Sequence, residues 1–207
     1  MSKNEKLEFD YEEYFDEQFK TTAILRFSTN YPSYTFAFYL NQLYSLDLER
    51  KDDVKLQIGA EEIPCPILSS ENIVKKLTYI MIDCSDALLS GQLSSIIFDK
   101  TLLIIGENAH QTAQAIYDDL NGIGAGHADE RRQAMLRSFI KRGILENALF
   151  DFSTPSMPRT TYFAQDAKTP ELKKKRDKFL KAQREFSTDI LWAVDSLLPD
   201  YETECYL

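Results

Sequence analysis

The feature that most constrains the fold of this chain is a change of hydrophobic pattern near Gly106. Before Gly106, short apolar runs rich in β-branched and aromatic residues alternate with turn residues, which is typical of strands. After Gly106, apolar residues recur at the spacing of an amphipathic helix. The pattern predicts an α+β fold, with a mostly antiparallel sheet, one helix packed on it, and a helical C-terminal region.

The first part of the chain contains predicted strands at 21–27, 53–58, 63–68, 76–82 and 101–105. Between the first two, Pro32 suits the first turn of a helix, because the N–H that proline lacks would have no partner there. Phe36, Leu40 and Leu43 then recur at helical spacing. Because this helix is apolar over much of its circumference, we expect it to pack flat on the sheet.

The second part of the chain predicts three helices, which begin near Asn108, Asp129 and Pro170. The last has about 28 residues between two prolines and would span roughly 42 Å. Since that length exceeds the width of the sheet, part of this helix must project or be covered by another element. We therefore divide the chain into a sheet domain at 1–106 and a helical region at 107–207, which can also pack as one domain.

Composition and charge narrow the classes of function. The apolar fraction of 43% is that of a folded protein, and the net charge of −9 does not favour attraction of the whole chain to nucleic acid or anionic lipid. No apolar run approaches the roughly 20 residues that span a bilayer, so no membrane partner is expected. The acidic N-terminus lacks the apolar core of a signal peptide, and the three cysteines form no CxxC pair. We therefore expect a cytoplasmic protein.

Residues 121–132 read NGIGAGHADERR and raise the question of a phosphate-binding loop. A dinucleotide fingerprint needs G-x-G-x-x-G directly after a strand, whereas this run follows a predicted helix and has another spacing. Asp129 and Glu130 would lie in the first turn of the next helix, where they favour the helix dipole and repel an anion. A hinge between two helices is the preferred interpretation.

A site for a small anionic ligand, in a binding protein or an enzyme, is the alternative. It would use the turn at 122–132, with the candidate residues Gly124, Gly126, His127, Arg131 and Arg132, or the strand-to-helix junction at 106–111. A deep pocket lined by either arginine, or specific thermal stabilisation by one nucleotide, would favour this alternative. The sequence contains no recognisable catalytic motif, and its two histidines lack metal-ligand spacing, so we assign no catalytic residue, metal or cofactor.

Residues 168–184 are strongly basic in an otherwise acidic protein. The charges run from Lys173 to Arg184, and such a segment contacts nucleic acid, contacts an acidic protein surface, or is a solvated helix face. The segment 7–19 is acidic with interleaved aromatic residues, so the two ends are complementary in charge. Pairing of these ends, within one chain or between two copies, is the preferred interpretation, and nucleic-acid binding stays open.

The long C-terminal helix also carries a near-heptad apolar stripe, which predicts contact with another helix. Its candidate interface residues are Leu172, Phe179, Phe186, Ile190 and Leu197. Together these patterns predict a non-catalytic protein that works through protein–protein contacts and forms homo-oligomers through this helix.

A helix with a Leu-Asn pair is followed by a Leu-x-Leu-Glu-Arg segment and an aspartate, at Leu40, Asn41, Leu46, Leu48, Glu49, Arg50 and Asp53. On these residues the chain, over roughly positions 20–106, resembles the bacterial IPExxxVDY family. The naming signature is not intact, because Ser90, Gly91 and Gln92 stand where Ile-Pro-Glu is expected. The resemblance implies a strand–helix–strand order and no activity. The charged residues at 47–53 are either a ligand site or a solvated turn in which Arg50 pairs with a neighbouring acid.

Overall fold

A computed structural model of the chain describes residues 20–29, 31–58, 61–86, 98–120, 130–141, 147–150 and 169–194. Its strands are β1 (Thr22–Ser28), β2 (Glu49–Ile58), β3 (Glu61–Asn72), β4 (Leu77–Asp83), β5 (Lys100–Ile105) and β6 (Asn147–Phe150). Its helices are α2 (Ser33–Tyr44), α4 (Ala109–Leu120), α5 (Glu130–Lys141) and α6 (Pro170–Val194). The predicted α+β class with a mostly antiparallel sheet is confirmed.

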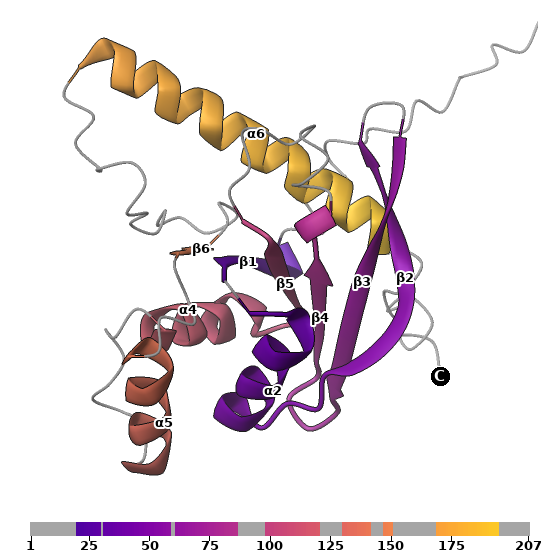
Figure 1. Cartoon of the computed structure of the whole chain (residues 1–207), viewed down its shortest axis with the longest axis vertical. Coiled ribbons are helices and arrows are strands. Elements are labelled where there is room, and N and C mark those ends of the chain that lie inside the picture. The colour runs from indigo at the N-terminus through magenta and orange to yellow at the C-terminus, as the bar shows by residue number, and fades with distance from the viewer. Residues whose placement is uncertain are drawn as a thin grey trace, which may run out of the picture.

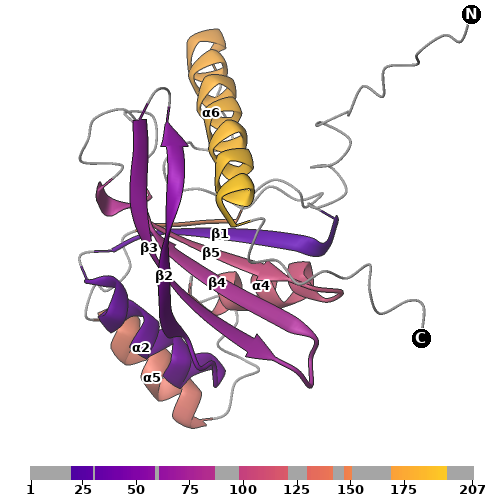
Figure 2. The same cartoon turned by 90° about the vertical axis from the view of Figure 1, so that its right-hand side faces the viewer.

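The strands form one antiparallel sheet in the order β2-β3-β4-β5-β1-β6 (Figures 1 and 2). Strand β2 begins at Glu49, before the predicted start at residue 53, and it has a bulge between Lys51 and Val54. The charged segment is therefore largely an edge strand, on which Arg50 forms an ion pair with Asp53. Strand β6 was not predicted, and it brings a segment from beyond Gly106 into the sheet beside β1.

Helices α2, α4 and α5 cover one face of the sheet (Figure 1). Sequence analysis placed one helix there, and the structure adds two more from the second part of the chain. The Phe36 ring of α2 has its centroid 5.2 Å from that of Phe27 on β1 and 6.1 Å from that of Phe139 on α5. These buried aromatic contacts connect α2, the sheet and α5 in one core.

The C-terminal end of α6 covers the opposite face. Ile190, Leu191 and Val194 are buried there in a second apolar cluster with residues of β1 to β5. The N-terminal turns of α6 extend past the strands in both views (Figures 1 and 2). Pro170 occupies the first position of the helix, where its missing N–H needs no partner. As expected from its length, one part of α6 packs on the sheet and another part projects.

A buried ion-pair network connects the ends of three elements on the α2 side of the sheet. The Lys100 side chain is 2% exposed, and its Nζ lies 2.8 Å from Asp99 Oδ2 and 3.3 Å from Asp83 Oδ1. The same Nζ donates to Ser85 Oγ at 3.1 Å. The other carboxylate oxygen of Asp83 accepts a hydrogen bond from Ser33, the first residue of α2. Lys100 therefore holds the start of β5 to the end of β4 and, through Asp83, to α2.

We expect Lys100→Met to lower the free energy of unfolding by about 3–5 kcal/mol, because it leaves two carboxylates without their buried counter-charge. The matched control is Lys55→Met, since Lys55 pairs with Glu62 at 2.9 Å but these side chains are 70% and 57% exposed. That control should unfold at nearly the same urea concentration as the unmodified chain, because solvent screens exposed ion pairs. Urea unfolding followed by circular dichroism measures both, and equal losses would contradict a structural role for the network.

Candidate functional site

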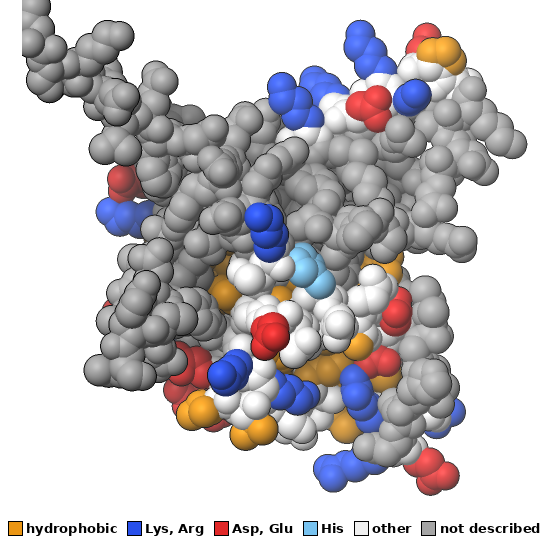
Figure 3. All heavy atoms as spheres, turned by 180° about the vertical axis from the view of Figure 1, so that it is seen from behind, with side chains coloured by type: hydrophobic (Ala, Val, Ile, Leu, Met, Phe, Trp, Pro, Cys, Tyr) orange, Lys and Arg blue, Asp and Glu red, His pale blue; other side chains and the backbone are white. Residues whose placement is uncertain are grey.

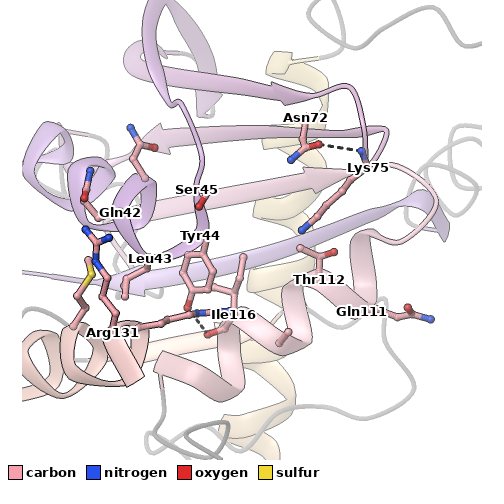
Figure 4. A pocket seen from close by; sticks show the side chains of 14 residues that line it. Gln42, Leu43, Tyr44, Ser45, Asn72, Lys75, Gln111, Thr112, Ile116 and Arg131 are labelled. Carbon is pink, nitrogen blue, oxygen red and sulfur yellow. Dashed lines mark hydrogen bonds between the residues drawn. The ribbon is translucent and has the colours of Figure 1, made fainter. Parts of the chain in front are cut away.

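A polar pocket of about 860 Å³ opens where the C-terminal end of α2, the β3–β4 turn, α4 and α5 meet (Figure 4). This volume lies in the range of about 300–1,000 Å³ that is usual for small-molecule sites. Its polar and aromatic lining residues are Asn41, Gln42, Tyr44, Ser45, Asn72, Lys75, Gln111, Thr112, Arg131 and Arg132.

Local turns place the pocket residues of α2 and of the β3–β4 turn. Helix α2 ends at Ser45, whose φ of 53° is in the left-handed region common at helix C-termini. The side-chain oxygen of Asn41 accepts a hydrogen bond from the Leu48 N–H at 3.0 Å, which fixes the chain as it leaves the helix. Similarly, the side-chain oxygen of Asn72 accepts from the Lys75 N–H at 3.0 Å and shapes the turn that carries Lys75.

Arg132 is held in place between α2 and α4. Its guanidinium lies 4.8 Å from the centroid of the Tyr44 ring and forms an ion pair with the Asp119 carboxylate. The Tyr44 hydroxyl donates to the Ile116 carbonyl oxygen at 3.5 Å (Figure 4). Burial raises the pKa of Asp119, and the adjacent Arg132 acts in the opposite direction. Burial also raises the pKa of Tyr44, so this phenol stays neutral across the physiological range.

Two further cations reach the pocket from its opposite ends. Lys75 extends from the β3–β4 turn toward Thr112, whereas Arg131 extends from α5 toward Gln42 (Figure 4). Both cationic side chains are exposed. Of the described side chains that line the pocket, three are cationic and none is acidic. The pocket is therefore positively charged on a protein whose net charge is −9.

The helix ends at the pocket have different electrostatic effects. Gln111 and Thr112 belong to the first turn of α4, and the two arginines belong to the first turn of α5. Positive dipole ends of this kind favour an anion, whereas the C-terminal end of α2 opposes one. Glu130 also lies in the first turn of α5, as predicted, but it is exposed and does not line the pocket.

The structure places only some of the ligand residues proposed from sequence. Gly124, Gly126 and His127 lie outside the described residues. Arg131 and Arg132 both line the pocket, so the structure brings together two of the residues proposed for the ligand-binding alternative. Tyr44 and Lys75 also line the pocket, and no sequence motif predicts that they lie beside α5.

The strand-to-helix junction at 106–111 has a structural explanation. Gly106 has a φ of +133°, and its N–H donates to the Thr21 carbonyl oxygen at 2.8 Å. A Cβ at this position would lie 2.3 Å from the carbonyl oxygen of Lys76. Glycine is therefore required for close packing against the β3–β4 turn. Of the predicted junction, only Gln111 lines the pocket.

Comparison with protein-family models, with curated proteins and with solved structures found no match for this chain. The resemblance to the IPExxxVDY family stays an expectation. In the part of the chain that the structure describes, no helix has the length and apolar character needed to cross a bilayer. Over the same residues, no group of three His, Cys, Asp or Glu side chains is placed to hold a metal ion.

We expect Arg132→Met to lower the free energy of unfolding by about 1–3 kcal/mol at neutral pH, because Asp119 then stays buried without its counter-charge. Burial alone would raise the pKa of Asp119 further in the folded state. Stability from such a group is present below the unfolded-state pKa and is lost as the pH rises through the folded-state pKa. The deficit should therefore be larger at about pH 7 than at about pH 4.

Urea unfolding at both pH values tests this expectation. Arg131→Met is the matched control, because it removes the same charge from the exposed neighbouring residue. A deficit that is the same at both pH values, or that Arg131→Met reproduces, would show that the Arg132–Asp119 pair does not stabilise the site.

Proposed function

We propose that this protein binds a small anionic ligand in the pocket between α2, α4 and α5. One observation carries the proposal: the described lining includes three cationic side chains and no acidic one, although the chain has 33 acidic and 24 basic residues. A positive pocket on an acidic protein would concentrate anions at this position. The volume of about 860 Å³ suits a ligand of nucleotide size.

The arrangement of the cations supports a ligand with more than one anionic group. Arg132 is partly neutralised by Asp119, so it forms a fixed wall together with Tyr44. Lys75 and Arg131 lie at opposite ends of the pocket and would bind separate anionic groups (Figure 4). Phosphate esters and dicarboxylates have this chemistry, since arginine and lysine are the usual partners of phosphate and carboxylate oxygens.

We propose binding rather than catalysis. The described lining contains no histidine, cysteine or carboxylate, which are the side chains that most often exchange protons near neutral pH. The Tyr44 hydroxyl is engaged with the Ile116 carbonyl oxygen, and burial raises its pKa. The side chains that remain serve recognition by charge and by hydrogen bonds from amides and hydroxyls.

Thermal unfolding with a panel of anions tests the proposal, using inorganic phosphate, nucleotides and dicarboxylates as probes. At least one probe should raise the melting temperature, because a ligand that binds only the folded state stabilises it. Lys75→Ala and Arg131→Ala should each weaken that binding about tenfold, the usual effect of losing a charged hydrogen bond. Lys55→Ala, which removes an exposed charge from β2, should leave binding unchanged. If no probe moves the melting temperature, the proposal fails.

A second candidate function is protein–protein contact through α6. Lysine side chains gather along the N-terminal turns of this helix (Figure 3). The exposed lysines are Lys173, Lys174, Lys175, Lys178 and Lys181. An acidic protein surface, including that of a second copy, would suit them, and nucleic acid is the further alternative.

The residues proposed for this interface are only partly described. Leu197 and the side chains of Leu172, Phe179 and Phe186 lie outside the described residues, as does the acidic segment 7–19. Ile190 is buried against the sheet of its own chain. Homo-oligomerisation through α6 therefore stays a proposal, supported by its projecting basic turns.

Charge reversal distinguishes the partners of α6. We expect Lys174→Glu with Lys178→Glu to dissociate oligomers in native mass spectrometry, because the helix would then repel an acidic partner surface. Lys51→Glu with Lys55→Glu makes the same charge change on β2 and should have no effect. Binding to DNA that falls steeply with salt would instead favour nucleic acid, because phosphate contacts release counterions. A monomer at all concentrations with no DNA binding at low salt would exclude both self-association and nucleic-acid binding through α6.

A cytoplasmic location is also part of the proposal. It is supported by the two described cysteines, Cys65 and Cys84, which are free thiols in the core. Free buried thiols are usual in compartments that keep cysteine reduced.

A further inference from the structure

Cys65 and Cys84 lie opposite each other near the end of the β3–β4 ladder. The last pair of this ladder is Ile67 with Ile82, and continuation of its register by two residues would place Cys65 opposite Cys84. Both cysteines are fully buried, and both belong to the core cluster on the α6 side of the sheet. Interaction with the Cys65 thiol, together with burial, raises the pKa of Cys84, as expected for two thiols that lie close together in this cluster.

Backbone hydrogen bonding shows what kind of cross-strand pair this is. The Cys84 N–H donates to the Asp99 carbonyl oxygen at 2.7 Å, so the backbone polar groups of Cys84 point toward β5 and away from β3. Relative to β3, Cys84 is therefore in a non-hydrogen-bonded position, where the Cα atoms of opposite residues are about 4.5 Å apart. That separation lies within the range of about 4.4–6.8 Å that disulfides bridge.

The neighbouring residue of β3 agrees with this arrangement. Pro66 stands opposite Asp83 in the same register, at a position where the ladder would require a backbone N–H. The recorded β3–β4 pairs end at Ile67, one residue away. The ladder of β3–β4 pairs thus stops beside the cysteines, so backbone pairing does not fix the separation of the two strands at that point.

The surroundings of the pair limit its reactivity while α6 is docked. The interaction with Cys65 and burial raise the pKa of Cys84, against the opposing effect of the buried Arg26 guanidinium. Ile190, Leu191 and Val194 of α6 share the core cluster with both cysteines. Since the thiolate is the reactive form and an oxidant must reach it, oxidation requires local opening of this face.

We propose that Cys65 and Cys84 are an oxidation site, at which a peroxide converts the two thiols into a cross-strand disulfide at a rate limited by the docked end of α6. In the first step a thiolate attacks the peroxide O–O bond, which gives a sulfenic acid and hydroxide. In the second step the other thiolate attacks the sulfenic sulfur, the S–S bond forms and hydroxide leaves. The two cysteines lose two electrons, and hydrogen peroxide is reduced to two molecules of water.

The site lies on the opposite face of the sheet from the ligand pocket, and it does not depend on the proposed function. The chemistry is reversible by thiol–disulfide exchange, so a reductant would restore the pair. The bond would connect strands that already pair, and it would close a short loop that contains the β3–β4 turn.

The test uses the folded full-length chain in a Cys205→Ser background, so that Cys65 and Cys84 are the remaining cysteines. After treatment with hydrogen peroxide, alkylation and intact-mass measurement should show both thiols lost together, with a mass lower by two hydrogen atoms. Cys65→Ser and Cys84→Ser should each stop at the sulfenic acid, which adds one oxygen atom. Independent oxidation of the two thiols, or a disulfide only between chains, would overturn the proposal.

Variants of α6 test whether its docking limits the rate. We expect Val194→Ala to speed disulfide formation about tenfold, because it removes two buried methyl groups and favours local opening. Val194→Thr keeps the side-chain volume but buries a hydroxyl group in the apolar cluster, so it should also speed disulfide formation. Lys181→Ala, at an exposed position of the same helix, should leave the rate unchanged. Equal rates in all these proteins, with native circular dichroism retained, would overturn the role of α6.

Discussion

Strands β1 and β5 are buried on both faces of the sheet, and this constraint determines where the helices must pack. All six residues of β5 and six of the seven residues of β1 are buried. Strands of this kind need a covering layer on each face of the sheet. Helices α2, α4 and α5 supply one layer, and the end of α6 contributes to the other. A charged side chain on such a strand needs partners inside the protein, and Lys100 has them in Asp83 and Asp99.

The candidate pocket is a consequence of how the first layer is assembled. Packing of Phe36 against Phe139 brings α2 and α5 together, and Arg132 then reaches both the Tyr44 ring and Asp119 of α4. These contacts fix the wall of the pocket, whereas the cations at its two ends stay exposed. A rigid polar wall with accessible charges suits recognition, because little order has to be gained when a ligand binds.

The two faces of the sheet therefore differ in chemistry. The α2 side combines an apolar core with a positively charged rim, while the α6 side contains the two thiols and the buried Arg26. The C-terminal end of α6 packs on this second face, and its basic N-terminal turns extend beyond the sheet into solvent. A partner that binds the projecting turns would act on the same helix whose C-terminal end packs in the core cluster that contains the thiols.

The sequence by itself determined the class of the fold and most of its elements. Five strands and four helices lie close to their predicted positions, because periodicity and the residues Pro32, Gly106 and Pro170 are local signals. Strand β6 was missed, since its four residues are a strand only through their pairing with β1. Only the tertiary structure decided which side chains form the pocket and that Cys65 meets Cys84. Those residues belong to separate elements, and local patterns do not encode how separate elements pack across a sheet.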